Sequence, residues 1–167
     1  SPAEHIMFMI LNISKGKNFY DQAVRNGKFE SIMHMKNNNN FELSNKKILI
    51  VGFGRIGRKL IKRCLGFEMK VYAYDPFVDK RIIESFGGIK VDDLNKSLKE
   101  IDILSLSVPL TEKTHNMINL EKMKIMKKSA VIINISRGGV VNERDLNEAL
   151  NNKIIYGAGL DVFEKEP

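Results

Sequence analysis

Three glycines are the residues of this 167-residue chain best suited to hold a phosphate-bearing ligand. Gly52, Gly54 and Gly57 follow an apolar run directly and open a segment with helical periodicity. Glycines at this spacing permit a tight strand-to-helix turn, close approach of backbone amides to a pyrophosphate, and close helix packing. The amino end of the helix also favours negative charge. The turn therefore predicts a dinucleotide site; glycines that serve only the turn are the structural alternative.

Asp75 is the second part of this pattern, because it ends the next apolar run along the chain. A carboxylate at that place accepts hydrogen bonds from the adenine-ribose hydroxyls. It would repel the 2′-phosphate of NADP, and the following residues 76–79 offer no cation in exchange. We therefore expect NAD as the cofactor, with Arg55 adding a positive charge near the phosphates. A simple turn at Asp75-Pro76 leaves the spacing from the glycines unexplained.

Polar and conformationally special residues also follow the later apolar runs. The carboxyl ends of parallel strands meet at one edge of a sheet, and ligands bind beyond that edge. We therefore expect one crevice to be lined by three segments: Ser107-Val108-Pro109-Leu110-Thr111 with Thr114, Asn134-Ile135-Ser136-Arg137-Gly138-Gly139, and Asp161.

Short apolar runs alternate with helical patterns from Lys47 onward, and this alternation predicts the elements that position the crevice. The expected strands lie at 48–51, 70–74, 103–106, 130–133 and 155–160, and the expected helices at 55–66, 80–86, 92–100, 119–126 and 142–152. Near-continuous apolar strands joined by crossover helices require a sheet covered on both faces. The sequence thus predicts an α/β fold: a Rossmann-like doubly wound parallel sheet of about six strands.

The N-terminal segment 1–27 is expected to form one helix that runs to about Arg25. Its first residues, Ser1-Pro2-Ala3-Glu4, combine a serine cap, a proline in the first turn and a glutamate that can reach back to the cap. Residues 6–11 are apolar on every side of the helix, which a solvent-facing amphipathic helix does not need. We therefore expect an interface helix, buried between domains or subunits.

Residues 28–46 have neither helical nor strand periodicity and include the run Asn37-Asn38-Asn39-Asn40. Such a segment is typical of a solvated loop, so we expect a linker here. The dinucleotide-binding domain is then expected at 47–167.

Composition narrows the function classes. The chain has 43% apolar and 28% charged residues and a formal net charge of +7, and its lysines are scattered rather than gathered in a basic stripe. Nucleic acid is therefore a less favoured partner than a small anion. The single Cys64 cannot form an internal disulfide, and no metal site is expected. Residues 6–11 are too short to span a bilayer, so we expect no membrane segment and a cytoplasmic location.

Taken together, the motifs resemble the NAD-binding domain of the D-isomer-specific 2-hydroxyacid dehydrogenases over nearly the whole chain. The first of these motifs is the glycine turn with Asp75. The others are Val108-Pro109-Leu110-Thr111 with Thr114, Asn134-Ile135-Ser136-Arg137-Gly138-Gly139 with Val141, and Gly157-Ala158-Gly159-Leu160-Asp161-Val162-Phe163 ending in Glu166-Pro167. Ser1-Pro2-Ala3-Glu4-His5 also resembles the start of the helix that packs across the dimer interface of this family.

The resemblance implies catalytic roles for Arg137 and Glu166. Arg137 would orient the substrate carboxylate and polarise the oxo group, a task suited to a rigid fork of donors. Glu166 would be the acid partner of a catalytic histidine. That histidine is expected beyond Pro167, since neither His5 in the first helix, His34 nor His115 stands at a matching position.

The resemblance also implies a set of cofactor contacts. Asp161 would bond to the nicotinamide carboxamide, Val108 and Pro109 would wall the adenosine, and the backbones of Ile135 and Ser136 would approach the nicotinamide ribose. The full set of expected cofactor-binding residues is Gly52, Gly54, Arg55, Ile56, Gly57, Asp75, Val108, Pro109, Thr114, Ile135, Ser136, Arg137 and Asp161.

The expected function is oxidoreduction at C2 of a D-2-hydroxy acid with NAD, and the first expected substrate is 3-phosphoglycerate, in serine biosynthesis. Glyoxylate or hydroxypyruvate reduction stays open, and so does an NAD-sensing module of the co-repressor type. The substrate domain is expected to lie largely outside this chain, which alone should bind NADH without turnover. The full-length protein is expected to be a homodimer.

Overall fold

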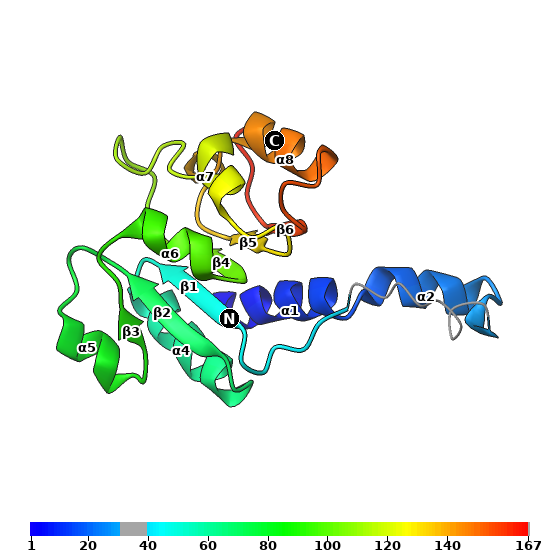
Figure 1. Cartoon of the computed structure of the whole chain (residues 1–167), viewed down its shortest axis with the longest axis horizontal. Coiled ribbons are helices and arrows are strands. Elements are labelled where there is room, and N and C mark those ends of the chain that lie inside the picture. Colours follow the sequence, from blue (N-terminus) through cyan, green and yellow to red (C-terminus); the bar gives the residue numbers. More distant parts are fainter. Residues whose placement is uncertain (31–39, 167) are drawn as a thin grey trace.

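The computed structural model describes residues 1–30 and 40–166 of the chain. Its centre is a sheet of six parallel strands in the order β3-β2-β1-β4-β5-β6 (Figure 1). The strands are β1 Lys47–Val51, β2 Lys70–Tyr74, β3 Ile89–Lys90, β4 Ile103–Leu106, β5 Val131–Asn134 and β6 Gly157–Leu160. This is the strand order of dinucleotide-binding folds, so the predicted fold class is confirmed.

The three central strands are buried on both faces, as their near-continuous apolar sequences predict. In β1, Ile48, Leu49 and Ile50 are all 0% exposed. Leu49 pairs with Tyr72 on one side and with Leu104 on the other. Helices must therefore cover both faces, because parallel strands need crossover connections.

The described helices form a layer on each face of the sheet. One core lies under α1 Pro2–Ser14, α4 Arg55–Gly66 and α5 Lys80–Ser85, which contribute buried residues such as Ile10, Leu60 and Ile83. The other lies under α6 Leu94–Glu100, α7 Leu120–Ile125 and α8 Glu143–Asn151, through residues such as Leu98, Met123 and Leu146. A short 3₁₀ turn, Gly138–Val140, follows β5. All five helices expected from 55 to 152 are present, with ends within two residues of prediction.

The N-terminal helix is shorter than predicted. The expected start is present, with a capping box between Ser1 and Glu4, but α1 ends at Ser14 and Gly16 adopts a left-handed φ of 60°. A separate helix, α2 Lys17–Arg25, follows; it has no buried residue and projects from the body of the domain (Figure 1). The prediction of a single helix from Ser1 to Arg25 was therefore wrong, because the glycine permits a break that apolar periodicity does not reveal.

The apolar stretch of α1 is buried within this domain itself. Ile6, Met7, Met9 and Ile10 are 0–8% exposed and pack into the core on the α4 side of the sheet. Each buried isoleucine contributes roughly 1.5–3 kcal/mol to stability. Only Phe8 remains strongly exposed, at 58%. Burial of residues 6–11 thus needs no second domain or subunit, contrary to the expectation.

The predicted linker is partly outside the described residues. Asn37, Asn38 and Asn39 fall there, as does His34. Phe29 and Glu30 are helical, which corrects the expectation of irregular structure from residue 28. After the gap the chain rejoins α1, because the Phe41 amide donates to the Ser14 carbonyl at 3.0 Å.

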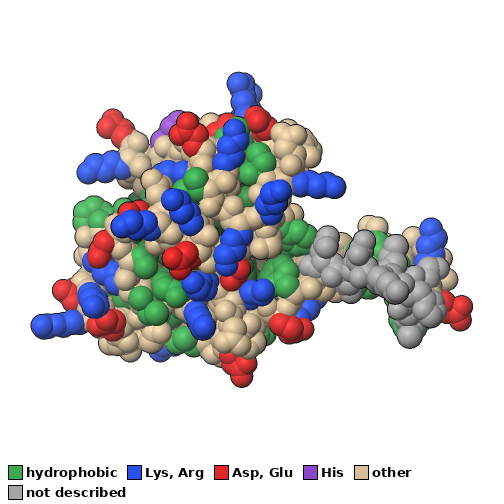
Figure 2. Space-filling view, in the orientation of Figure 1, with side chains coloured by type: hydrophobic (Ala, Val, Ile, Leu, Met, Phe, Trp, Pro, Cys, Tyr) green, Lys and Arg blue, Asp and Glu red, His purple; other side chains and the backbone are tan. Residues whose placement is uncertain are grey.

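Basic and acidic side chains are interspersed over the face drawn in Figure 2. Within the described residues, no helix has the length and apolar character that crossing a membrane requires.

Candidate functional site

The carboxyl ends of all six strands lie at one edge of the sheet, since every neighbouring pair is parallel. The strand order reverses between β1 and β4, whose ends Val51 and Leu106 are paired. Ligands of open α/β sheets bind beyond such an edge, at the reversal point. All the predicted site residues except those of the first turn of α4 come from loops that start at this edge, and α4 itself starts there.

The glycine turn after β1 requires glycine at two positions for steric reasons. Gly52 has a φ of 92°, and a Cβ built on it would lie 2.5 Å from the Ser107 carbonyl oxygen. A Cβ on Gly57 would lie 2.5 Å from the Gly52 carbonyl oxygen. These contacts hold the turn against the end of β4 and the helix against the strand.

Gly54 differs from both neighbours, because a Cβ there would meet nothing within 4 Å. Gly54 is exposed, and its φ of −78° is open to any residue. No packing argument explains a glycine at this place. The open space beside its backbone is what a bound pyrophosphate needs, so the residues present fit the dinucleotide that the sequence predicts.

The amino end of α4 also lacks the capping side chain found on its neighbours. Helices α5, α6, α7 and α8 each begin with an Asp or Asn whose side chain accepts a hydrogen bond from the first turn. Helix α4 begins at Gly54 with no such bond and no acidic residue in its first turn. Its first amides, those of Arg55 and Ile56 among them, have no partner within the helix and can therefore bind an anion. The Arg55 side chain is exposed beside them.

Asp75 lies beside this turn, directly after β2. Its Oδ2 accepts a hydrogen bond from the Phe53 amide at 2.8 Å, and its Oδ1 accepts one from the Phe77 amide at 2.9 Å. The first bond ties the carboxylate to the middle of the glycine turn. A carboxylate has about four acceptor positions, so both oxygens can still accept bonds from a ribose.

The loop after β4 is held by a threonine. Thr114 Oγ1 donates to the Pro109 carbonyl at 2.6 Å and accepts from the Thr111 amide at 2.8 Å. Val108 adjoins the glycine turn, since its Cγ1 would lie 2.9 Å from a Cβ on Gly52. Val108 therefore lies against the first glycine of the turn, and Pro109 follows it in the same loop. The buried Ser107 Oγ finds no hydrogen-bond partner among the described residues.

Asn134 organises the loop that carries Arg137, a part that the motif alone did not reveal. It is 1% exposed, its Nδ2 donates to the Arg137 carbonyl at 2.9 Å, and its Oδ1 accepts from the Ser136 amide and hydroxyl at 3.0 and 2.7 Å. Ile135 is half-buried against the core between them. A buried amide with three bonds fixes the backbone on both sides of the arginine.

The Arg137 side chain is exposed at this edge. Its Nη1 donates to the Ser136 carbonyl at 2.7 Å, and no other hydrogen bond to the guanidinium forms within the described part of the chain. The remaining donors can therefore bind a small carboxylate in the fork geometry of arginine.

The segment that follows β6 packs directly on the arginine loop. A Cβ on Gly138 would collide with the backbone of Phe163 and Glu164. Glu166 closes this segment on itself, because its Oε1 accepts from the Phe163 amide at 3.0 Å. The structure thus places the segment bearing Glu166 next to the turn bearing Arg137.

Asp161 and the histidines are the remaining residues that the sequence singled out. Asp161 follows β6, and its Oδ1 lies 3.3 Å from Nε2 of His5 on α1. His5 therefore lies on the exposed side of α1, although the helix as a whole was expected to be buried. His115 is exposed and adjoins Gly139. The sequence offered no signal for the His5–Asp161 contact, which joins the two ends of the chain.

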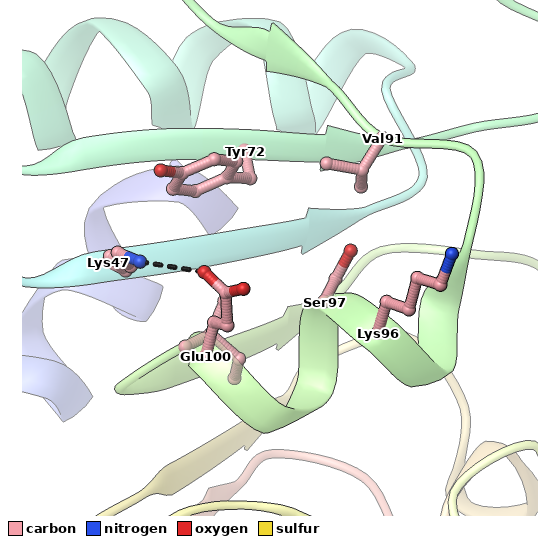
Figure 3. Close-up of a pocket in the computed structure, with 7 residues that line it drawn as sticks. Lys47, Tyr72, Val91, Lys96, Ser97 and Glu100 are labelled. Carbon is pink, nitrogen blue, oxygen red and sulfur yellow. Dashed lines mark hydrogen bonds and ion pairs between the residues drawn. The ribbon is translucent and has the colours of Figure 1, made fainter.

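A separate small cavity of about 140 Å³ lies toward the amino end of β1 and is distinct from this edge (Figure 3). Across it, Lys47 Nζ donates to Glu100 Oε2 at 2.9 Å. This hydrogen bond raises the pKa of Lys47 and lowers the pKa of Glu100. The two charged groups pair with each other, so neither charge is left for a ligand to bind. It is lined by Lys47, Tyr72, Val91, Lys96, Ser97, Glu100 and Ile101.

Comparison with known proteins shows where this arrangement recurs. The sequence model of the D-isomer specific 2-hydroxyacid dehydrogenase, NAD binding domain, matches residues 7–167. The chain is 45% identical over 126 residues to a D-3-phosphoglycerate dehydrogenase of Methanocaldococcus jannaschii, covering 75% of this chain and 24% of that protein. It is 40% identical over 168 residues to a glyoxylate reductase of Pyrococcus furiosus, covering 99% of this chain and 50% of that protein.

Solved structures agree. The D-lactate dehydrogenase of Aquifex aeolicus, crystallised with NAD and lactic acid, superposes with a TM-score of 0.88 at 35% identity, covering 98% of this chain and 47% of that one. The chain thus spans half or less of the length of these relatives.

Proposed function

The chain belongs to the D-isomer specific 2-hydroxyacid dehydrogenase family, whose NAD-binding domain it carries, and we propose that it is the cofactor half of an oxidoreductase. The reaction interconverts a D-2-hydroxy acid and its 2-oxo acid. Bound NAD supplies the acceptor or donor of the hydride. The substrate half lies in a second domain of the full-length protein.

The observation that carries this proposal is the open, uncapped start of α4 beside Asp75. Gly54 leaves room where packing does not require it, and the first-turn amides have no capping side chain. Asp75 is held against the same turn through the Phe53 amide. In the proposed complex the pyrophosphate lies on the α4 amides, and the adenine ribose bonds to Asp75.

Arg137 and Glu166 are the catalytic residues of the proposal. Arg137 binds the substrate carboxylate with its outward donors and polarises the oxo group. Glu166 orients a histidine proton donor that the second domain contributes, and its carboxylate stabilises the protonated imidazole. Direct packing of Gly138 on Phe163 and Glu164 supports a shared site, because it keeps the two loops together.

For the substrate, we propose 3-phosphoglycerate first and glyoxylate or hydroxypyruvate as the alternative. The phosphoglycerate dehydrogenase relative, 45% identical over 126 residues, supports the first, and a glyoxylate reductase of Thermococcus litoralis, 47% identical over 127 residues, supports the alternative to the same degree. The glyoxylate reductase of Pyrococcus furiosus also supports the alternative, since its match extends over 99% of this chain. The domain that contacts the far end of the substrate decides between them.

The test is a turnover assay of the full-length protein. NADH oxidation is measured with glyoxylate, hydroxypyruvate and phosphohydroxypyruvate, and NAD reduction with 3-phosphoglycerate. Arg137→Lys keeps the positive charge but loses the bidentate donor geometry of the guanidinium, so kcat/KM should fall roughly 100-fold. Arg144→Lys, an exposed arginine on α8, is the matched control and should change little. No NAD-linked turnover on any of these acids would refute the enzyme proposal.

The proposal extends to assembly and location. Helix α2 projects without any buried residue and exposes Phe19 and Val24 at 52% and 55%, which supports a homodimer formed through this helix. The one cysteine, Cys64, is free, as is typical of proteins of the reducing cytoplasm.

A further inference from the structure

The contact between His5 and Asp161 joins the first helix of the chain to the end of the last strand. His5 Nε2 lies 3.3 Å from Asp161 Oδ1, and the two side chains are 43% and 56% exposed. Neither the glycine turn nor the Arg137 loop takes part in it. The contact therefore needs an explanation of its own.

Both partners sit on rigid elements. The Asp161 amide donates to the Asn134 carbonyl at 3.0 Å, which continues the pairing of β5 with β6. Helix α1 packs directly on β6, because a Cβ on Gly159 would lie 3.0 Å from Met9 Sδ. The His5 ring stacks on Phe8 with an interplanar angle of 17°. The imidazole is therefore held beside the carboxylate by the fold and does not reach it from a loose loop.

The contact uses one carboxylate oxygen and leaves the other. Within the described residues, Asp161 Oδ2 has no hydrogen-bond partner. The 3.3 Å separation lies within ion-pair range, and a protonated imidazole carries both an N–H at Nε2 and the charge that attracts the carboxylate. A carboxylate held through one oxygen has already lost rotamer freedom before any ligand arrives. Less side-chain entropy is therefore lost when the ligand binds.

We infer that His5 is a positioning residue that holds Asp161 ready for the carboxamide of the nicotinamide ring. The inference rests on the proposed function and on the family resemblance, which implies this contact for Asp161. His5 acts only through Asp161 and touches no reacting atom. Its loss should weaken NADH binding about two- to fivefold, which corresponds to about 0.4–1 kcal/mol and lies within the range of exposed ion pairs.

The test compares two ligands by calorimetry on the full-length protein. NADH carries the nicotinamide, whereas ADP-ribose shares the rest of the dinucleotide contacts and lacks that ring. His5→Phe keeps a ring to stack on Phe8 and removes the donor. His5→Gln keeps an N–H donor. Glu4→Gln breaks the neighbouring ion pair of α1 with Arg63, 2.7 Å long, while glutamine preserves the capping box, and it serves as the control.

We expect His5→Phe to weaken NADH two- to fivefold and to leave ADP-ribose unchanged. His5→Gln should restore most of the NADH affinity, and Glu4→Gln should alter neither ligand. Asp161→Ala should weaken NADH alone, and the double variant His5→Phe/Asp161→Ala should bind NADH no more weakly than Asp161→Ala, because the two residues act as one unit.

The outcomes separate the two proposals. ADP-ribose binding with unchanged NADH affinity in His5→Phe would overturn the role of His5 and leave the dinucleotide site intact. Equal weakening of both ligands would also overturn it, because α1 would then support the whole site. If the unaltered protein bound neither ligand, the proposed function itself would fail.

Discussion

Replacing Gly54 by alanine tests whether this glycine is present for the ligand rather than for the fold. A Cβ there meets no atom within 4 Å, and the backbone φ of −78° is ordinary for alanine. Removing a glycine at such a position reduces the entropy of the unfolded chain and raises the free energy of unfolding by about 0.4–1 kcal/mol. Gly54→Ala should therefore be at least as stable as the original protein.

The same methyl group stands where backbone amides would meet the pyrophosphate. Loss of one hydrogen bond to a charged group costs about 1.5–3 kcal/mol, so the dissociation constant of NADH should rise roughly tenfold or more. Calorimetric titration with NADH measures the affinity, and thermal unfolding without ligand measures the stability of the same sample.

Gly57→Ala is the matched comparison, because its Cβ would lie 2.5 Å from the Gly52 carbonyl oxygen, where ordinary contact begins at 3.4 Å. Overpacking of this kind costs about 1–3 kcal/mol, which lowers the melting temperature by roughly 2–12 °C in a domain of this size. Gly54→Ala that binds NADH normally, or that loses as much stability as Gly57→Ala, would refute the assignment of the open space to the pyrophosphate.

Three further outcomes are expected. Asp75→Ala should weaken NADH about tenfold or more and narrow the preference for NADH over NADPH, which titration with both cofactors measures; unchanged NADH affinity would contradict the ribose contact. Asn134→Ala removes three hydrogen bonds around Arg137, so unfolding by heat should reveal a loss of about 2 kcal/mol, and kcat/KM of the full-length protein should fall at least tenfold; full activity would contradict a positioning role. Burial raises the pKa of the Cys64 thiol from 9.0 to about 12, so the stability that the neutral thiol contributes is complete below pH 9 and is lost as the pH rises toward 12. In denaturant titrations over that range, Cys64→Ala should lose less free energy of unfolding than the original protein. An identical loss would contradict the buried thiol.

The elements with strong periodicity were predictable to the residue. Helix α4 at 55–66 and the strands β2 at 70–74 and β4 at 103–106 have the predicted bounds. Their apolar residues alternate or repeat in step with a local backbone geometry, so a short window of sequence contains the whole signal. Strand β3 was missed because it has two residues and pairs only with β2.

The break at Gly16 shows a different limit. No apolar side chain occurs from Ser14 to Asn18, and a single glycine between lysines is compatible with either a continuous or a broken helix. At the break the chain also makes a tertiary contact, because the Phe41 amide donates to the Ser14 carbonyl at the end of α1. Sequence separation hides that partner from any local pattern.

In the candidate site, too, some residues were predictable from local sequence and others depend on tertiary packing. The glycine turn and Asp75 were predictable because each needs only its own loop geometry and a spacing along the chain. The contact of His5 with Asp161 depends on how α1 packs on β6, and the role of Asn134 depends on which of its neighbours turn toward it. Local pattern therefore identifies the candidate ligand contacts better than it identifies the residues that hold them in place.

The packing of Gly138 has a consequence for how the proposed catalytic residues are brought together. Because no side chain fits between position 138 and the backbone of Phe163 and Glu164, the loop of Arg137 and the segment of Glu166 cannot separate without breaking this contact. Asn134 fixes the first loop to the end of β5, and Asp161 begins the second at the end of β6, one strand away. The backbone segments that carry Arg137 and Glu166 are thus packed on each other within this domain. In the proposed enzyme, closure of the second domain has to bring only the histidine and the substrate wall to a pair already in place, so rigid-body motion between domains would control proton delivery and not the geometry of the carboxylate-binding arginine.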